Sequence, residues 1–251
     1  MKTIAIALLV ILMTTVGCTN RPSVANAVTS TKGLTTDSTI YGLACEECND
    51  TIVVFLRQPY DGSDPDTLNV FEAKRRQQVF GSIRPGDQLA IMCNADDSTV
   101  ADIVIVTQDL LGRWCYKVRP TPKRRAEHDS LTQEQIAERL PDSIRRMLSV
   151  EREYGFTLKI DSVAFPIWTN DINNNDNNLP VEYPPITLYR QWYISNGKLM
   201  LVQSITDSVG NNQVLGQDTA QLVRLTADTL VLRFSNGEQS YYRNDATDNQ
   251  P

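Results

Sequence analysis

Apolar and polar residues alternate most regularly in the C-terminal part of the chain, residues 186–243. Residues 187–195 carry aromatic and aliphatic residues at period two, and Asn196-Gly197 separates them from a second strand-like run at residues 198–205. This pair favours a two-residue hairpin, because both turn positions need positive φ. The alternation continues through residues 218–225, 229–234 and 238–243, with a second Asn-Gly pair at 236–237. Five consecutive strands of this kind predict an antiparallel meander, which must close on itself or be covered.

Three further strands precede the meander, at residues 113–119, 156–160 and 163–168, with a tight turn at Asp161-Ser162. The strands then number eight, enough to close a barrel around packed side chains or one small ligand. Long connections alternate with short turns along the chain, at residues 120–154, 169–185 and 206–216. Alternate connections of an up-and-down barrel lie at opposite ends. All long connections are therefore predicted at one rim, which would form an open mouth.

Period two also predicts which side chains face the barrel interior. The predicted inward-facing apolar residues are Phe156, Leu158, Ile160, Val163, Phe165, Ile167, Leu188, Trp192, Ile194, Leu199, Leu201, Leu230, Leu232 and Phe234. Arg190 and Gln203 interrupt this face. Because an unpaired buried guanidinium is costly, Arg190 is expected at the mouth or beside an anionic partner. The predicted ligand-binding residues are Phe156, Leu158, Phe165, Ile167, Leu188, Arg190, Trp192, Leu201 and Leu232.

The first barrel strand opens with Gly112-Arg113-Trp114, and Arg243 lies near the end of the last strand. A Gly-x-Trp at the head of the first strand, a meander and a late arginine resemble the lipocalin superfamily, specifically the lipocalin-like lipoproteins of Gram-negative bacteria. The resemblance covers roughly residues 112–244. It implies that Trp114 packs across the closed end of the barrel against Arg243. From the residues alone, Trp114 is equally well explained as a plain core aromatic.

The N-terminal half follows a different pattern, with short strands at residues 39–44, 51–57, 67–71, 88–92 and 101–106. Five short strands predict a small β-barrel over residues 39–108. Residues 80–90 resemble the turn-to-strand entry of OB-like or SH3-like barrels. The predicted fold class is therefore all-β, a small barrel followed by an eight-stranded lipocalin-like barrel. A fold of this kind does not by itself identify a function.

The N-terminus has the pattern of a targeting segment. Lys2 precedes an apolar run at residues 4–13 that is too short to span a bilayer as a mature helix. Residues 1–17 are therefore predicted to be a signal peptide. Residues 18–38, a Ser- and Thr-containing tract without apolar periodicity, are predicted to be a flexible tether.

The signal peptide ends at Thr15-Val16-Gly17-Cys18, which resembles the lipobox of bacterial lipoproteins, with Thr15 where leucine is usual. The resemblance implies that Cys18 is lipidated and becomes the mature N-terminus. Thr19 follows the cysteine in place of Asp, which by the sorting rule of this family favours the outer membrane, facing the periplasm. The alternative is an ordinary secretory signal with an incidental cysteine.

Charge limits the partners of the chain. The formal net charge is −6, and loss of Lys2 with the signal peptide would change it to −7. Nucleic acid is an unfavourable partner, because its phosphates repel an acidic protein. Two basic runs, Lys74-Arg75-Arg76 and Lys123-Arg124-Arg125, are predicted to be solvated faces, with phosphate or lipid-head-group contact as the alternative.

The first long connection carries a helical pattern over residues 130–150. Its apolar residues recur every four positions, at Ile136, Leu140, Ile144 and Leu148. Ser130 and Gln133 are predicted to form a capping box, and Pro141 is expected to kink the helix or begin a second one. The insertion would serve as a lid over the mouth or as a structural plug.

Four cysteines lie beyond Cys18, at positions 45, 48, 93 and 115. In an oxidising envelope they favour structural disulfides, such as Cys45 with Cys48 and Cys93 with Cys115. Redox activity of the Cys45-Glu46-Glu47-Cys48 motif is less favoured, because both glutamates would raise thiol pKa values. The four cysteines could instead form a zinc site, or they could be unpaired and buried.

Classical catalytic motifs are not evident in the sequence. The single histidine, His128, lies in a polar stretch far from any nucleophile motif. Residues 171–182 resemble an EF-hand loop in spacing, but Asp176 stands where glycine is needed, so an Asn-rich solvated loop is the prediction. No cofactor is predicted.

We therefore expect a lipid-anchored extracytoplasmic protein whose barrel binds a small apolar or amphipathic molecule. The alternative is a non-enzymatic interaction module that binds a protein or glycan through its loops and N-terminal domain. An enzyme acting on lipid-like substrates is the third possibility, and carboxylates converging with Arg190 in a cavity would support it.

Overall fold

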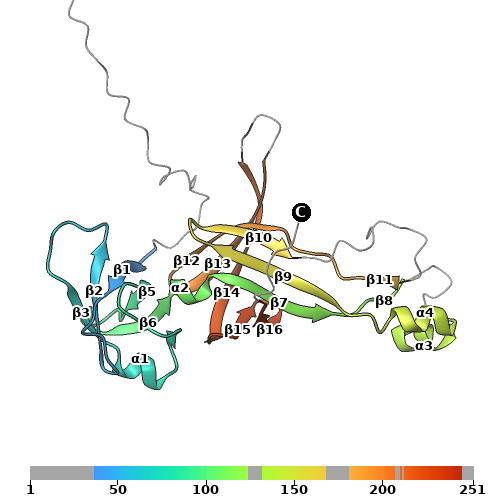
Figure 1. Cartoon of the computed structure of the whole chain (residues 1–251), viewed down its shortest axis with the longest axis horizontal. Helices are drawn as coiled ribbons and strands as arrows, with labels where there is room; N and C mark the ends of the chain where they lie inside the picture. Colours follow the sequence, from blue (N-terminus) through green and yellow to red (C-terminus); the bar gives the residue numbers. More distant parts are fainter. Residues whose placement is uncertain (1–36, 124–131, 168–180, 207–209, 211, 245–251) are drawn as a thin grey trace, which may run out of the picture. The chain divides into compact units, whose positions relative to one another are not determined.

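The structure is a computed structural model that describes residues 37–123, 132–167, 181–206, 210 and 212–244. The predicted signal peptide, Cys18 and most of the tether lie outside the described residues. So do His128 and most of the Asn-rich loop. The described residues form two groups of strands, a small sheet and a barrel (Figure 1).

The small sheet has six strands in the order β3-β2-β1-β5-β6-β4. Its strands are β1 (Ile40–Ala44), β2 (Ile52–Gln58), β3 (Asp66–Asn69), β4 (Val79–Phe80), β5 (Gln88–Cys93) and β6 (Ala101–Val106). Helix α1 (Phe71–Arg75) follows β3, and α2 (Thr107–Leu110) follows β6. The edge strands do not pair with each other, although a parallel bridge joins Asn69 to Val100. The predicted OB-like or SH3-like barrel is therefore not confirmed.

The second group is a closed antiparallel barrel of eight strands, as predicted. Its strands are β7 (Gly112–Val118), β9 (Arg152–Lys159), β10 (Val163–Ile167), β12 (Tyr189–Ser195), β13 (Lys198–Thr206), β14 (Asn212–Leu225), β15 (Thr229–Phe234) and β16 (Gly237–Arg243). Each strand pairs with the barrel strand that follows it in the chain, and β16 returns to pair with β7. This up-and-down order fixes which connections share a rim.

The first predicted Asn-Gly hairpin turn lies where expected, and the second is displaced by one residue. Asn196 and Gly197 have φ values of 49° and 69° and connect the paired residues Ser195 and Lys198. At the second Asn-Gly pair, Phe234 pairs with Gly237, so the two-residue loop is Ser235-Asn236. Gly237 therefore opens β16 rather than occupying the turn.

The long connections meet at one rim, which we call the mouth. A two-stranded ribbon joins the first connection to the second, pairing β8 (Thr121–Pro122) with β11 (Val181–Glu182). The opposite rim, the base, carries the short turns at residues 160–162, 196–197 and 226–228. The prediction of an elaborated mouth and a short-turned base is confirmed for these connections. The third predicted long connection, residues 206–216, is wrong in extent, because β13 continues to Thr206 and β14 begins at Asn212.

The predicted helical insertion forms two helices, α3 (Gln133–Arg139) and α4 (Asp142–Met147). Pro141 separates them, as its missing N–H requires. The capping box uses Thr132 and Gln135, whose backbone N–H groups each bond the other's side chain. The predicted partner Ser130 lies outside the described residues. Ile136 of α3 is buried.

The small sheet covers the base of the barrel and shares its core. Phe80, Ala90, Ile105 and Leu110 belong to the same hydrophobic cluster as the barrel interior. The Tyr41 hydroxyl donates to the Ile194 carbonyl at 2.6 Å. A second cluster lies within the small sheet itself. Among the described residues, no helix is long and apolar enough to cross a membrane.

Two barrel strands differ from the predicted facing. Directly paired residues share a face, so Ala164 lies inside with its partner Leu158, and Phe165 lies outside, 43% exposed. In β12 the register shifts between Tyr189 and Gln191, and this bulge leaves Arg190 exposed. The predictions that Phe165, Leu188 and Arg190 face the interior are therefore wrong, as is that for Ile160, which is also exposed. Val163 and Ile167 alternate with Ala164 and share the outer face of Phe165, so their predicted inward facing is wrong as well.

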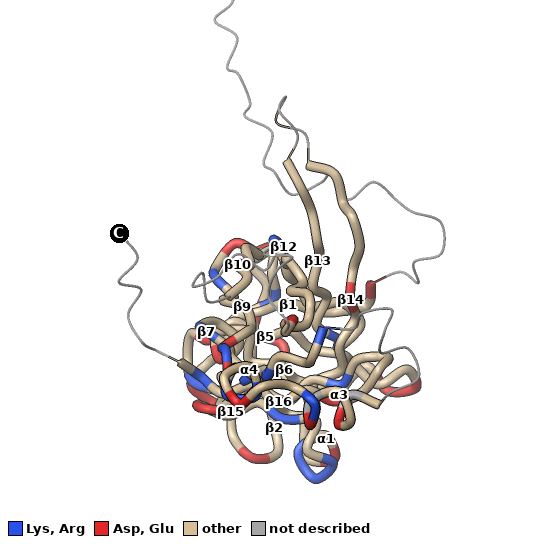
Figure 2. The backbone as a smooth tube through the Cα atoms, turned by 90° about the vertical axis from the view of Figure 1, so that its right-hand side faces the viewer, with Lys and Arg blue, Asp and Glu red and all other residues tan. Residues whose placement is uncertain are grey.

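β13 and β14 continue past their neighbours as a two-stranded arm at the mouth, residues 204–206 and 212–215 (Figure 2). The arm exposes Ile205, Val214 and Leu215. Its described residues carry no charge.

Candidate ligand-binding site

The base of the barrel is held by Trp114 and Arg243. The Arg243 guanidinium lies over the Trp114 ring, 4.2 Å from its centroid. Trp114 is fully buried, and its Nε1 donates to the Leu110 carbonyl at 2.8 Å. The contact implied by the lipocalin resemblance is therefore present.

Arg243 also ties the barrel to the segment that precedes it. Its Nη1 donates to the Leu111 carbonyl at 2.6 Å, and its Nη2 donates to the Asp109 carbonyl at 2.8 Å. Gly112 has a φ of 127°, and a Cβ there would lie 2.2 Å from Arg243 Nη1. The Gly-x-Trp spacing thus leaves room for the guanidinium directly beside the first strand.

The barrel interior above this base is filled with side chains. Six of the predicted ligand-binding residues are buried, namely Phe156, Leu158, Ile167, Trp192, Leu201 and Leu232. All but Ile167 belong to the shared hydrophobic cluster. Ile167 pairs with Gly155, so it is buried on the outer face of β10 and not in the barrel interior. The other three, Phe165, Leu188 and Arg190, lie on the outer surface. The middle of the barrel is therefore a packed core.

A pocket of about 670 Å³ opens at the mouth, above this core. Three tyrosines line it, Tyr116 from β7, Tyr189 from β12 and Tyr241 from β16. Its wall also contains Phe234, the carboxylates of Asp218 and Glu238, and the amides of Gln217 and Gln239. None of the nine predicted ligand-binding residues lines this pocket.

The floor of the pocket is an aromatic cluster. The Tyr116 and Tyr241 rings meet edge to face with centroids 5.3 Å apart. Phe156 contacts Tyr241 at 5.0 Å and Tyr189 at 6.0 Å between ring centroids. These contacts connect the pocket wall to the packed interior and fix the orientation of its rings.

Tyr189 and Asp218 form the closest polar pair in the wall. The Tyr189 hydroxyl donates to Asp218 Oδ2 at 2.5 Å. Burial, followed by this hydrogen bond to the carboxylate, raises the pKa of Tyr189. Burial likewise raises the pKa values of Tyr241 and Tyr116. All three hydroxyls are therefore neutral at physiological pH.

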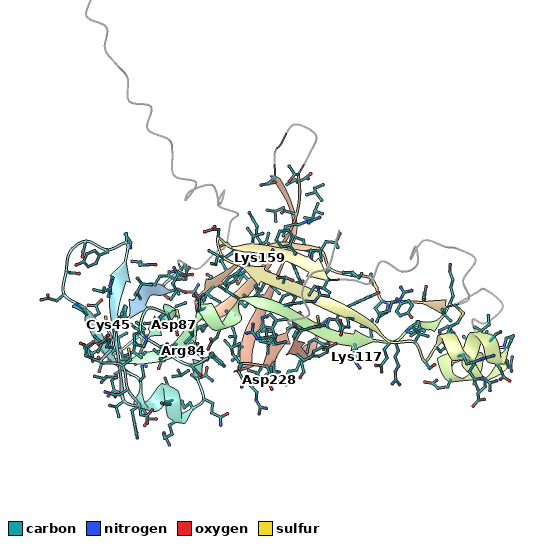
Figure 3. The ribbon with its side chains drawn as sticks, viewed as in Figure 1. Cys45, Arg84, Asp87, Lys117, Lys159 and Asp228 are labelled. Atoms are coloured by element: carbon teal, nitrogen blue, oxygen red, sulfur yellow. The ribbon has the colours of Figure 1, made fainter. Side chains whose placement is uncertain are left out.

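Positive charge is kept out of the described pocket wall, which contains carboxylates but no Lys or Arg. Arg233 and Lys117, which are sequence neighbours of the wall residues Phe234 and Tyr116, are each paired with a carboxylate. Arg233 pairs with Glu238 at 2.5 Å, and Lys117, labelled in Figure 3, pairs with Glu151 at 3.3 Å. The Asp218 carboxylate has no Lys or Arg partner among the described residues.

The helical insertion does not line this pocket in the part of the chain that is described. α3 contacts β8 of the ribbon at the mouth. The structure therefore gives the insertion a place at the rim but no lid contact with the tyrosine-lined wall.

The cysteines form no disulfide: Cys45, Cys48, Cys93 and Cys115 are all free thiols. The predicted bridges are therefore wrong. Cys93 packs against the cluster of the small sheet, whereas Cys115 is buried in barrel strand β7, so the two lie in separate modules. Burial raises the pKa of both thiols. Among the described residues, no group of His, Cys, Asp and Glu could hold a metal ion.

The basic run of α1 is matched by carboxylates. Lys74 pairs with Asp50, and Arg75 pairs with Glu72 at 2.6 Å. Arg76 lies 3.8 Å from the same glutamate. These exposed pairs agree with the prediction of a solvated face.

Comparisons with known proteins add little. No family model and no curated protein matches the chain. A crystal structure of a lipocalin-like protein from Bacteroides thetaiotaomicron is similar to 54% of this chain and 96% of that protein, with 19% identity and a TM-score of 0.28. The assignment of the barrel rests on its own strand order and pairing.

Proposed function

We propose that the barrel binds a small amphipathic molecule at its mouth and is not an enzyme. The observation that carries this proposal is the pocket of about 670 Å³ above a packed core. Its size lies within the range of small-molecule sites, roughly 300–1,000 Å³. Rings and polar groups share its wall, so a ligand with an apolar body and a polar end fits better than a wholly apolar one.

Neighbouring residues on β16 allow a matched test of this proposal. Gln239 lines the pocket, whereas Ser240 is exposed and does not line it. Gln239→Trp should fill the pocket, and Ser240→Trp should leave it open. Calorimetric titration with decanol, decanoate and decylamine, each kept monomeric, should show that at least one probe binds.

Binding should survive in Ser240→Trp and fall by at least about tenfold in Gln239→Trp, since the filled pocket loses contact area. If none of the three probes binds the wild-type protein, or if both variants bind equally, the mouth is not the binding site.

We also propose that Cys18 carries a lipid anchor and that the anchored protein faces the periplasm. Its support is the lipobox-like sequence before Cys18. The chain enters the described unit at the base, where the Asn196 N–H is within hydrogen-bond distance of Thr39 Oγ1 and Asp37 Oδ1.

Metabolic labelling with a palmitate analogue tests the anchor. Wild-type protein should be labelled and recovered with membranes, and Cys18→Ser should be neither. Labelling of the Cys18→Ser variant would contradict the proposal.

A further inference from the structure

We propose that the mouth pocket selects amphipathic ligands that carry a primary or secondary amine. The inference rests on the proposed function, because it names the class of molecule that the same pocket takes. Three groups in the pocket wall support it: the Asp218 carboxylate and the hydroxyls of Tyr116 and Tyr241.

Asp218 sets the sign of the charge. It is half-buried, and one of its oxygens already accepts a hydrogen bond from Tyr189 at 2.5 Å. No Lys or Arg pairs with it in the described part of the chain. A partly desolvated carboxylate without a counter-charge favours a cationic partner.

Tyr116 and Tyr241 supply further hydrogen-bonding atoms. Tyr241 is only 6% exposed, and within the described residues neither hydroxyl has a hydrogen-bond partner. A hydroxyl oxygen that borders the pocket can accept hydrogen bonds from a ligand. An alkylammonium group has several N–H donors for these oxygens and for Asp218, whereas a quaternary ammonium has none.

The aromatic and acidic residues in the rest of the pocket wall also favour a cationic ligand. Electron-rich ring faces attract ammonium groups, and three tyrosines and Phe234 line the pocket. Glu238 adds a second carboxylate, but Arg233 neutralises it at 2.5 Å. Asp218 would repel a fatty-acid carboxylate, and the described wall contains no Lys or Arg to bind such a ligand.

The test compares ten-carbon probes that differ only in their heads. Calorimetry on the full-length wild-type protein should give decylamine an affinity at least about tenfold above that of decanol. Decanoate should bind more weakly than decanol, and decyltrimethylammonium more weakly than decylamine. Equal affinities for decylamine and decanol would overturn the proposal.

Two carboxylates that line the same pocket provide the variant and its control. Asp218→Asn keeps a side-chain oxygen for Tyr189 but removes the charge, and should lower the ratio of decylamine affinity to decanol affinity by at least about tenfold. Glu238→Gln, which alters an already paired charge, should change decylamine affinity by less than about threefold. Equal losses in the two variants, or none in Asp218→Asn, would contradict the inference.

Salt gives a readout that needs no variant. Raising NaCl from about 0.05 M to about 0.5 M should weaken decylamine binding and leave decanol binding unchanged, because salt screens the attraction to Asp218. Decanol binding without an amine preference would reject the amine class and keep the proposed function. Absence of binding by every probe would reject the proposed function itself.

Discussion

The two ends of the barrel are built differently. At the base, the Arg243 guanidinium is stacked on Trp114 and donates to main-chain carbonyls, and the small sheet packs beneath it. At the mouth, the hydroxyls of Tyr116 and Tyr241 and the Asp218 carboxylate border an open pocket. The Arg243 guanidinium is satisfied by carbonyls of the chain, whereas the Tyr116 and Tyr241 hydroxyls face the pocket, where the proposed ligand would bind. Changes at the base should therefore alter stability, and changes at the mouth should alter binding.

The largest expected effect is that of Trp114→Ala. Removing this fully buried ring deletes core contacts and the stacking partner of Arg243. The free energy of unfolding, measured by urea denaturation, should fall by about 3–5 kcal/mol. Phe165→Ala, on the outer face, is the control and should cost less than about 1 kcal/mol. Similar losses in both variants would contradict the description of the base.

Gly112→Ala should have the next largest effect. Its φ of 127° disfavours a side chain, and the new Cβ would lie 2.2 Å from Arg243 Nη1. We expect a loss of about 1–3 kcal/mol in the free energy of unfolding. Gly62→Ala is a matched control, since its φ is also positive, at 88°, but nothing lies within 4 Å of its Cβ position. An equal loss in both would show that backbone conformation, rather than contact with Arg243, sets the cost.

Alkaline pH should weaken the junction between the small sheet and the base. Burial, followed by the charge of Asp37, raises the pKa of Tyr41 from 10.0 to about 12. As pH rises, Tyr41 therefore ionises in the unfolded chain before it ionises in the folded protein. The stability that comes from keeping Tyr41 neutral is complete below pH 10.0 and is lost as pH rises to about 12. Urea denaturation across this range should show a steeper decline for wild type than for Tyr41→Phe. Identical slopes would rule out the contribution.

The smallest effect on stability is expected from Tyr241→Phe at the mouth. The hydroxyl has no hydrogen-bond partner among the described residues, so its removal should change the free energy of unfolding by less than about 0.5 kcal/mol. Decylamine affinity should nevertheless fall several-fold. A large loss of stability with unchanged affinity would reverse the assigned roles of the two ends.

The strand count, the closed barrel and the grouping of long connections could be predicted from the sequence. Period-two alternation and turn residues such as Asn196-Gly197 report local geometry directly. The sequence could not predict which side chains of β10 and β12 point into the barrel. The bulge at Arg190 and the pairing of Ala164 with Leu158 depend on neighbouring strands.

The candidate site was missed for a related reason. The prediction looked for apolar residues inside the barrel, but these residues pack against one another and fill it. The pocket wall is formed instead by tyrosines and polar residues, among them Tyr189 at the start of β12 and Asp218 in the middle of β14. Tyr116 and Tyr241 do lie at even spacing from Trp114 and Arg243, and this was the available signal.

The most direct test is an amide chemical-shift map of the isotopically labelled protein during titration with decylamine. The account predicts saturable shifts at Thr187, residues 217–219 and residues 235–239, all in the pocket wall. Residues 110–114 and 226–228 at the base should not move. Shifts concentrated at the base, or spread evenly over the barrel, would contradict the division of the molecule into a base for stability and a mouth for binding.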